Sequence, residues 1–377
     1  MVRSLLAAVG AAAVVAVHGA SGTPAQLLYV STLGADGGGC TRVAPCRSFD
    51  AAYGAARPGA QVIVAAGDYP PQTVAARPRQ GAPVVFAPAP GAKVVIADEL
   101  NVFASHLEFR DMTASDWYVR EGATDVTFRR MNVQLFFIRS ASKIRVLGGS
   151  VGGIDDSSAA TVGSAYLSKV PATAVLIDGV AFHDITRRAN PSGHVQCLFV
   201  QSVDGLVIRN STFRHCDVFD VFVNNIGVGP VPKNMLFEND LFDKASDGGF
   251  YSLFVRQDPG DTIDGLVVRY SSFLQGPHFD PGSYAHSRVV GIVSPFTSGQ
   301  CTSGITFAHN VFDGARCAPT DRRAPLGYVD PTAFRLGLKA GAAGIDAGDA
   351  KDTPRKDIRG RPRPRGKAPD AGAYENA

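Results

Sequence analysis

An eight-residue block recurs eight times along this chain of 377 residues, and it restricts the possible folds more than any other feature. The blocks begin at Leu107, Val126, Ile144, Val175, Leu206, Met235, Leu266 and Ile305. Positions one, three and eight are apolar in every copy, and position eight is phenylalanine in the last five. Because apolar residues two apart face one side of a β-strand, each block predicts a short strand, a bend and a return to the core.

The spacing of the blocks indicates which repeat architecture they build. Their starts are separated by 19, 18, 31, 31, 29, 31 and 39 residues. A propeller blade needs four strands in about 40 residues, which the short intervals cannot hold, whereas one coil of a parallel β-helix fits. Tight bends are predicted at position five, where four blocks carry Gly148, Gly179, Asn210 and Asn239. Stacking of successive coils predicts an internal ladder of Phe182, Phe213, Phe242, Phe273 and Phe312.

A second apolar stretch lies between the later blocks, at residues 197–201, 220–224 and 252–256. These stretches are predicted to be neighbouring parallel strands. Their alignment gives two columns, Gln201 with Asn224 and Arg256, and Cys197 with Asp220 and Ser252. Earlier coils are predicted from apolar runs at 62–64, 84–86 and 94–96. A helix predicted at 48–57, with Ser48 as its N-cap, would cover the first coil, because a solenoid needs a cap at its ends.

The N-terminus has the pattern of a secretory signal peptide, which we expect at residues 1–25. Arg3 precedes an apolar run from Leu5 to Val17, and small residues follow up to Ala25. The alternative is a retained membrane anchor, but the run is shorter than the roughly 20 residues that a span needs. No later segment qualifies as a span, so we expect a secreted protein without one.

Six cysteines agree with export, since disulfides persist in oxidising compartments. Closeness in sequence predicts the pairs Cys40–Cys46, Cys197–Cys216 and Cys301–Cys317. A zinc site is the alternative, but the chain has no Cys-x-x-Cys and no matching histidine spacing.

Segments at both ends of the chain point to a known superfamily. They are Leu28–Thr32, Pro45–Gly54, Gly59–Tyr69, Gly344–Asp349, Asp357–Pro362 and Pro369–Glu375. These segments resemble those of secreted bacterial right-handed parallel β-helix proteins of the pectate-lyase-like superfamily. The resemblance implies an all-β, right-handed parallel β-helix over residues 26–340, with an N-terminal capping helix. An irregular tail at 341–377 would cap the other end.

The resemblance also implies a chemistry, because enzymes of this superfamily usually act on polysaccharides along a groove beside one sheet. Its lyases remove a proton next to a uronate carboxylate with an arginine or lysine base. Acidic side chains often hold calcium, a hard cation that takes several oxygen ligands. Related hydrolases use paired carboxylates instead. The sequence motifs of pectate lyases and of polygalacturonase-like hydrolases are both absent from this chain.

Polar residues concentrate in the coils with the longest loops, roughly residues 183–288, where we expect a carbohydrate groove. The candidate catalytic residues are Arg256, Lys244, His194 and His215. The candidate substrate-binding residues are Gln201 and Asn224. The candidate calcium ligands are Asp217, Asp220, Asp243 and Asp247. The alternative is that these side chains are solvated loop residues that cap turns.

Charge is distributed unevenly along the chain. The formal net charge is +3, yet residues 351–367 hold eight basic and two acidic residues. We interpret this segment as a solvated capping tail rather than a nucleic-acid site, with an anionic wall or matrix polymer as the alternative partner. The predicted function is polysaccharide processing by a lyase of acidic glycans. The alternative is a non-catalytic carbohydrate-binding or surface β-helix.

Overall fold

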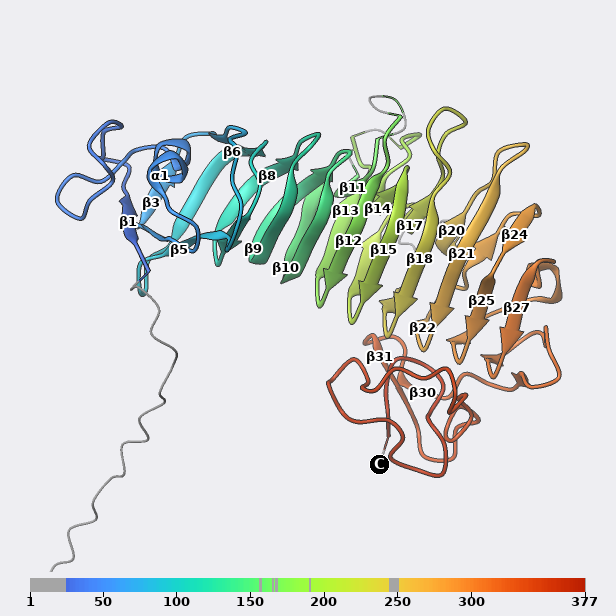
Figure 1. Ribbon diagram of the computed structural model, residues 1–377. Helices are drawn as coiled ribbons and strands as arrows, with labels where there is room; N and C mark the ends of the chain where they lie inside the picture. Colours follow the sequence, from blue (N-terminus) through green and yellow to red (C-terminus); the bar gives the residue numbers. More distant parts are fainter. Residues whose placement is uncertain are drawn as a thin grey trace, which may run out of the picture.

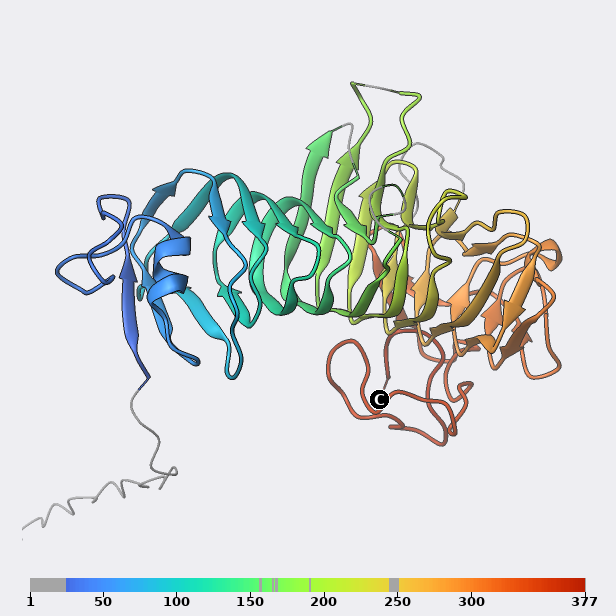
Figure 2. The ribbon, with the colours of Figure 1, turned by 45° about the horizontal axis from the view of Figure 1, so that its top comes forward.

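The chain winds into a parallel β-helix, shown along its length in Figures 1 and 2. The computed structural model describes residues 25–155, 158–164, 166, 169–189, 191–243 and 251–376. Pairing links the strands from β1 (Leu27–Val30) to β29 (Arg322–Arg323) in one network of 29 strands, and every pairing within it is parallel. The predicted all-β, right-handed parallel β-helix is therefore confirmed. The predicted signal peptide lies outside the described residues except for Ala25.

Each coil contributes to three sheets, which we name in chain order. Positions one to four of the blocks form the first sheet, with β1, β2 (Gln61–Val64), β5 (Val84–Pro88), β7 (Leu107–Arg110), β9 (Thr124–Ile138), β10 (Ser142–Asp155), β12 (Ala172–Asp178), β15 (Val203–Arg209), β18 (Lys233–Glu238), β21 (Thr262–Arg269), β25 (Ser287–Val290) and β27 (Ile305–Ala308). A short strand β24 (Ser283–Ala285) pairs with the start of β21.

The second sheet follows the bend and contains the end of each block. Its strands are β3 (Gly67–Tyr69), the start of β6 (Val94–Val102) and of β8 (Thr113–Val119), parts of β9 and β10, β13 (Ala181–Thr186), β16 (Thr212–Cys216), β19 (Leu241–Phe242), β22 (Ser272–Phe273), β26 (Val293–Ser294), β28 (Val311–Phe312) and β29. The third sheet contains the second apolar stretch. Its strands are β4 (Gln72–Val74), the ends of β6, β8 and β9, β11 (Ala160–Val162), β14 (Gln196–Val200), β17 (Phe219–Val223), β20 (Tyr251–Val255) and β23 (His278–Phe279).

The bend at position five has a left-handed backbone in every block. Its φ angle is between 50° and 70° at Asp111, Arg130, Gly148, Gly179, Asn210, Asn239, Tyr270 and His309. Glycine and asparagine tolerate this conformation, as predicted, whereas arginine, tyrosine and histidine adopt it at a cost. Stacking of the coils therefore imposes the bend even where the local residue does not favour it.

The internal phenylalanine ladder is confirmed for four of its five predicted members. Ring centroids are 4.7 Å apart between Phe182 and Phe213, 5.0 Å between Phe213 and Phe242, and 4.4 Å between Phe242 and Phe273. The rings lie within 5° of parallel. The prediction for Phe312 is wrong, because its ring stacks on Phe296, at 4.4 Å, and not on Phe273.

Phe312 is displaced because the last interval of 39 residues holds one more coil than the blocks indicate. Strand β25 pairs with β21 on one side and with β27 on the other. Ser287 occupies position one of this coil and Ser294 occupies position eight. Two polar residues at positions that are apolar in the other blocks hid this repeat.

The N-terminal cap and the disulfides agree with the sequence. Helix α1 (Phe49–Ala55) begins after Ser48, whose hydroxyl accepts a hydrogen bond from the Ala51 N–H at 3.1 Å. The ring of Phe49 stacks on that of Phe86 at 5.1 Å, which attaches the helix to the first coils. All three predicted disulfides are present: Cys40–Cys46, Cys197–Cys216 and Cys301–Cys317. Among the described residues, no helix is long and apolar enough to cross a membrane.

The C-terminal tail lies along the side of the later coils, next to the bends of the first sheet (Figures 1 and 2). It follows an antiparallel hairpin of β30 (Tyr328–Asp330) and β31 (Arg335–Leu338). The Gly372 N–H donates to the Gly291 carbonyl at 2.7 Å, and the Tyr270 hydroxyl donates to the Asp349 carbonyl at 2.8 Å. The tail is irregular, as predicted, but it packs across several coils rather than over the open end.

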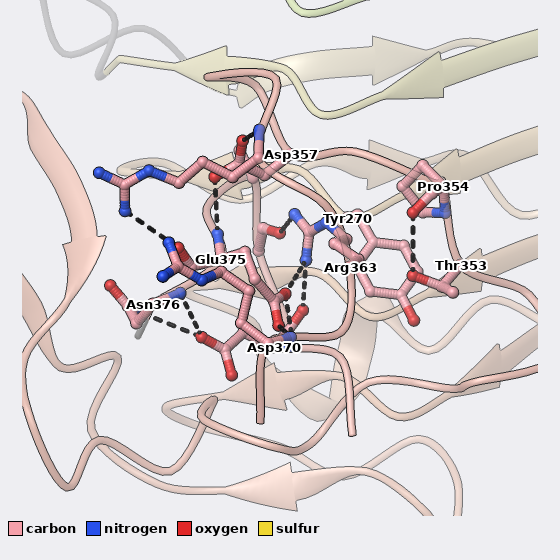
Figure 3. Close-up of polar contacts among 12 residues, drawn as sticks. Tyr270, Thr353, Pro354, Asp357, Arg363, Asp370, Glu375 and Asn376 are labelled. Carbon is pink, nitrogen blue, oxygen red and sulfur yellow. Dashed lines mark hydrogen bonds and ion pairs between the residues drawn. The ribbon is translucent and has the colours of Figure 1, made fainter. Parts of the chain in front are cut away.

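A buried ion pair holds the tail together (Figure 3). The Arg363 guanidinium lies 3.2 Å from the Glu375 carboxylate, and neither side chain is exposed. The same guanidinium lies 4.8 Å from the centre of the Tyr270 ring, so the pair also contacts the coils. Burial raises the pKa of Glu375, whereas hydrogen bonds from the backbone N–H groups of Arg365 and Asp370, and then the charge of Arg363, lower it.

Replacing Phe213 by alanine should lower the free energy of unfolding by about 3–5 kcal/mol, because it leaves a cavity between two stacked rings. Urea denaturation followed by circular dichroism measures the change. Phe103→Ala is the control, since Phe103 is 42% exposed. A loss at Phe213 no larger than that at Phe103 would contradict the ladder.

Replacing Arg363 by methionine should destabilise the protein by about 3–5 kcal/mol, because Glu375 would be left buried without its partner. The double variant Arg363→Met with Glu375→Leu should recover part of this loss, since no buried charge remains, while the backbone N–H groups of Arg365 and Asp370 lose their acceptor. Thermal unfolding compares the two. Equal destabilisation by the single and the double variant would show that the ion pair is not the cause.

Candidate functional site

The third sheet presents a row of aromatic side chains on its outer face, which we call the aromatic row. Side chains alternate along a strand, so the buried Leu198 and Val200 place Phe199 on the opposite face. In-register pairing stacks the equivalent residues Asn101, Tyr118, Phe137, Thr161, Phe199, Phe222, Phe254 and His278. Ring centroids are 5.2 Å apart for Tyr118 and Phe137, 5.1 Å for Phe199 and Phe222, and 5.4 Å for Phe222 and Phe254.

A second row, which we call the polar row, lies two residues further along each coil. It contains Phe103, Arg120, Arg139, Gly163, Gln201, Asn224, Arg256 and Asp280. Each residue donates its N–H to a carbonyl of the preceding coil, as Asn224 does to Val200 at 3.0 Å and Arg256 to Val223 at 2.9 Å. The predicted column of Gln201, Asn224 and Arg256 is confirmed as part of this row.

A cavity of about 440 Å³ opens where both rows are interrupted. Thr161 stands in the aromatic row between Phe137 and Phe199, and Gly163 stands in the polar row between Arg139 and Gln201. A Cβ atom at Gly163 would lie 2.1 Å from the Ser202 carbonyl oxygen, so no larger residue fits there. These six members of the two rows line the cavity together with Ser158, Ser164 and Tyr166.

Arg139 brings an uncompensated positive charge into this cavity. Its guanidinium lies 5.8 Å from the ring centres of both Tyr118 and Phe137, and its Nε atom is buried without a hydrogen-bond partner. In the part of the chain that the structure describes, Arg139 makes no ion pair. Arginines of the first sheet differ, since Arg129 bonds Glu108 at 2.7 Å and Arg209 pairs with Asp178 at 2.8 Å. A partly buried arginine without a carboxylate favours the binding of an anion.

Arg120, one coil earlier, is already engaged within the protein. Its guanidinium hydrogen-bonds the Asn101 side chain, lies 3.7 Å from Glu99 and stacks over Tyr118 at 4.5 Å. Burial lowers the pKa of Arg120, and the nearby charge of Arg139 lowers it further. The two arginines therefore repel each other, and an anion between them would relieve this repulsion.

Arg139 was missed in the sequence although a signal for it exists. The third-sheet stretch ends in aromatic, β-branched and polar residues, as in Phe199-Val-Gln201. The same pattern recurs as Tyr118-Val-Arg120 and as Phe137-Ile-Arg139. These earlier copies follow the block directly, without the long loops that mark the later coils, and so were not recognised as a separate strand.

Two candidates from the sequence share one partner at the C-terminal part of the polar row. The Asn224 amide donates to an Asp258 carboxylate oxygen at 3.2 Å, and the Arg256 guanidinium lies 4.0 Å from the same carboxylate. Arg256 is 53% exposed. The His194 ring lies edge-on to Phe222 of the aromatic row, with centroids 6.4 Å apart. The structure thus places Arg256, Asn224, Gln201 and His194 on one face.

Other candidates form a separate cluster, at the start of β17 rather than at its end. The Nδ1 atom of His215 hydrogen-bonds the Asp184 carboxylate at 2.9 Å, and its Nε2 atom lies 4.0 Å from Asp243. This hydrogen bond from His215 is the main cause that lowers the pKa of Asp184. Asp217 accepts the Arg187 N–H at 2.8 Å. Asp184, His215 and Asp217 line a cavity of about 510 Å³.

Asp220 lies beneath the surface, between these two groups. Its side chain is fully buried, and neither carboxylate oxygen has a hydrogen-bond partner among the described residues. Burial, and then the charge of Asp243, raise the pKa of Asp220 well above its ordinary value. An enclosed carboxyl group whose pKa is raised is a poor calcium ligand, because the cation binds the deprotonated form.

The predicted calcium site is not assembled by the described residues. Among them, no group of three histidine, cysteine, aspartate or glutamate side chains is arranged to hold a metal ion. Asp247, a predicted ligand, and Lys244, a predicted base, both lie outside the described residues. The calcium site therefore stays a prediction.

No protein family and no curated protein sequence matches this chain. Among solved structures, it is similar to pectate lyase Pel9A with a TM-score of 0.55 and 16% identity, over 93% of this chain and 96% of that one. A rhamnogalacturonan lyase gives 0.43 at 12% identity, over 81% and 91%. The A-module of mannuronan C-5 epimerase AlgE4 from Azotobacter vinelandii gives 0.25 at 11%, over 74% and 94%. The match to pectate lyase Pel9A confirms the β-helix fold.

Replacing Asp220 by asparagine should make stability less dependent on pH. Below a pH of about 3.9, both the folded and the unfolded wild type carry the proton, so the variant should unfold like the wild type. As the pH rises, only the unfolded wild type loses its proton, which costs about 1.4 kcal/mol per pH unit until the raised pKa is reached. The uncharged amide of the variant would not incur this cost.

Urea denaturation of wild type and Asp220→Asn between pH 4 and pH 8 measures the difference. The free energy of unfolding of the variant should exceed that of the wild type by an amount that grows with pH, as expected if Asp220 is buried and its pKa is raised. A constant gap would contradict it. Calcium that stabilises the wild type but not the variant would support the predicted metal site instead.

Proposed function

We propose that this protein is secreted, that it binds an acidic polysaccharide along the outer face of the third sheet, and that it cleaves this polymer by β-elimination. The observation that supports this most is the cavity in which unpaired Arg139 lies between Phe137, Phe199 and Gln201. Three disulfides agree with export, because such bonds persist outside reducing compartments.

The two rows suit a chain of uronate sugars. Rings of the aromatic row stack on one another, so apolar surface for the C–H faces of sugar rings is open at Phe137 and Phe199, where Thr161 interrupts the row. The polar row offers donors for hydroxyl and carboxylate oxygens. An arginine fork matches a carboxylate in geometry and charge. Adjacent coils are about 4.8 Å apart, so a polymer lying across the strands would contact Arg139, Gln201 and Arg256 in turn. Asn224 is only 2% exposed and donates to Asp258, so it would act by positioning that carboxylate beside Arg256.

We assign the role of base to Arg256, in keeping with the arginine or lysine base that the pectate-lyase-like resemblance implies. For a 4-linked uronide, the base takes the proton from C5 and the C5–H electron pair forms the C4–C5 double bond. The C4–O bond breaks, and the leaving oxygen is protonated. His194, which contacts Phe222, is our candidate for that proton donor.

The proposal predicts that purified protein generates the ultraviolet absorbance of unsaturated uronates from polygalacturonate or alginate, measured with calcium and with a chelator. Arg256→Ala should lower turnover by about 100-fold or more while binding persists, because it removes only the base. Arg139→Ala should weaken binding by about 10- to 100-fold, because it removes a charged hydrogen-bond donor.

Arg145→Ala is the matched control, since Arg145 lies on the first sheet and pairs with Asp125 at 2.9 Å. It should change neither binding nor turnover. Retention of a polyuronide without product would favour the non-catalytic, carbohydrate-binding alternative. Unchanged binding by Arg139→Ala would show that this cavity is not part of the binding site. Unchanged turnover by Arg256→Ala would show that Arg256 is not the base.

A further inference from the structure

The tail surface carries cations that the folded chain does not neutralise, because both acidic residues of the segment 351–367 are engaged. The Asp352 carboxylate accepts hydrogen bonds from Arg269 at 2.5 Å and from Arg288 at 2.6 Å, both on the coils. Asp357 accepts three backbone N–H groups of the tail, at 2.8, 2.9 and 3.0 Å. These carboxylates are therefore committed to docking and shaping the tail.

Most basic residues of the segment have no such partner. Arg363 is buried in its ion pair, and Arg359 stacks over the Tyr374 ring at 4.5 Å. Five others are exposed and make no ion pair within the described ranges: Lys351, Arg355, Lys356, Arg365 and Lys367. Opposite charges are interspersed on an ordinary surface, so this concentration of one sign creates a positive field.

A cavity of about 590 Å³ lies where this surface meets the coils. Its walls carry Arg209 and Arg269 from the first sheet and Arg355 and Lys356 from the tail. Glu238, the acidic side chain of the coil wall, pairs with Arg269 at 2.5 Å. Asp357, whose buried carboxylate is held by backbone N–H groups, also lines the cavity. The exposed charges there that have no ion-pair partner among the described residues are those of Arg355 and Lys356, and both are positive.

We propose that this cavity and the exposed cations around it form a second binding site for acidic polysaccharide, distinct from the one on the outer face of the third sheet. This inference rests on the proposed function, because the polymer bound here is the same acidic polysaccharide that we propose for the third sheet. Thr353, Pro354 and Ile358 add small and apolar surface to the cavity, which suits sugar rings. A polymer held at one site has a high effective concentration at the other, so the tail would keep a long substrate on the molecule.

The test compares full-length wild type with the double variant Arg355→Glu and Lys356→Glu. Binding to polymeric polygalacturonate and alginate is measured at low ionic strength, and turnover is measured on a trisaccharide of the same uronate. We expect binding of the polymer to weaken about tenfold or more and turnover of the trisaccharide to stay unchanged. The difference in binding should shrink at 1 M salt, where charges are screened within about 3 Å.

The matched control is Arg42→Glu with Arg47→Glu, which changes the net charge equally in the exposed loop at the N-terminal end. The tail site would be contradicted if the tail variant bound the polymer as tightly as the wild type, or if the control lost as much affinity as the tail variant. Tighter binding of polyphosphate than of either polyuronide would overturn its assignment to polysaccharide. The two proposals can also be separated. If no polyuronide is cleaved and Arg139→Ala binds it like the wild type, the proposed site on the third sheet is wrong. If the tail variant nevertheless binds the polymer more weakly, the tail site is supported.

Discussion

In-register parallel pairing between successive coils is the constraint on which the rest of the structure depends. Because each residue lies next to its equivalent in the coil before, one sequence position becomes a continuous row in space. Inside the solenoid this produces the stack of Phe182, Phe213, Phe242 and Phe273. Outside, the same register produces the aromatic row and the polar row. Core and candidate site therefore have one physical origin.

Unbroken rows give a solenoid an even outer face, and the third-sheet cavity of this protein lies where both rows are interrupted. Here Thr161 and Gly163 replace a ring and a long polar side chain in neighbouring positions of one coil, and the cavity opens between them. Close packing against Ser202 keeps position 163 free of a side chain. Arg139 lines this cavity, and its guanidinium has no carboxylate partner among the described residues. The cavity is therefore a candidate site for binding an anion.

The sequence predicted the features that repeat, and missed those that depart from the repeat. Blocks with Phe213 or Phe242 at position eight were recognisable, whereas the coil with Ser287 and Ser294 was not, because its core positions are polar. The column of Gln201, Asn224 and Arg256 was predictable from strand alignment. Arg139 was not, since its importance comes from having no carboxylate partner among the residues that the structure describes, which only the fold reveals.

Recognition of uronate by the outer face of the third sheet is tested most directly by a crystal structure of the protein with a bound oligouronide. It should show a uronate carboxylate within hydrogen-bonding distance of Arg139 and a sugar ring against Phe137 or Phe199. An oligouronide bound only elsewhere, with Arg139 still without an anionic partner, would contradict this recognition.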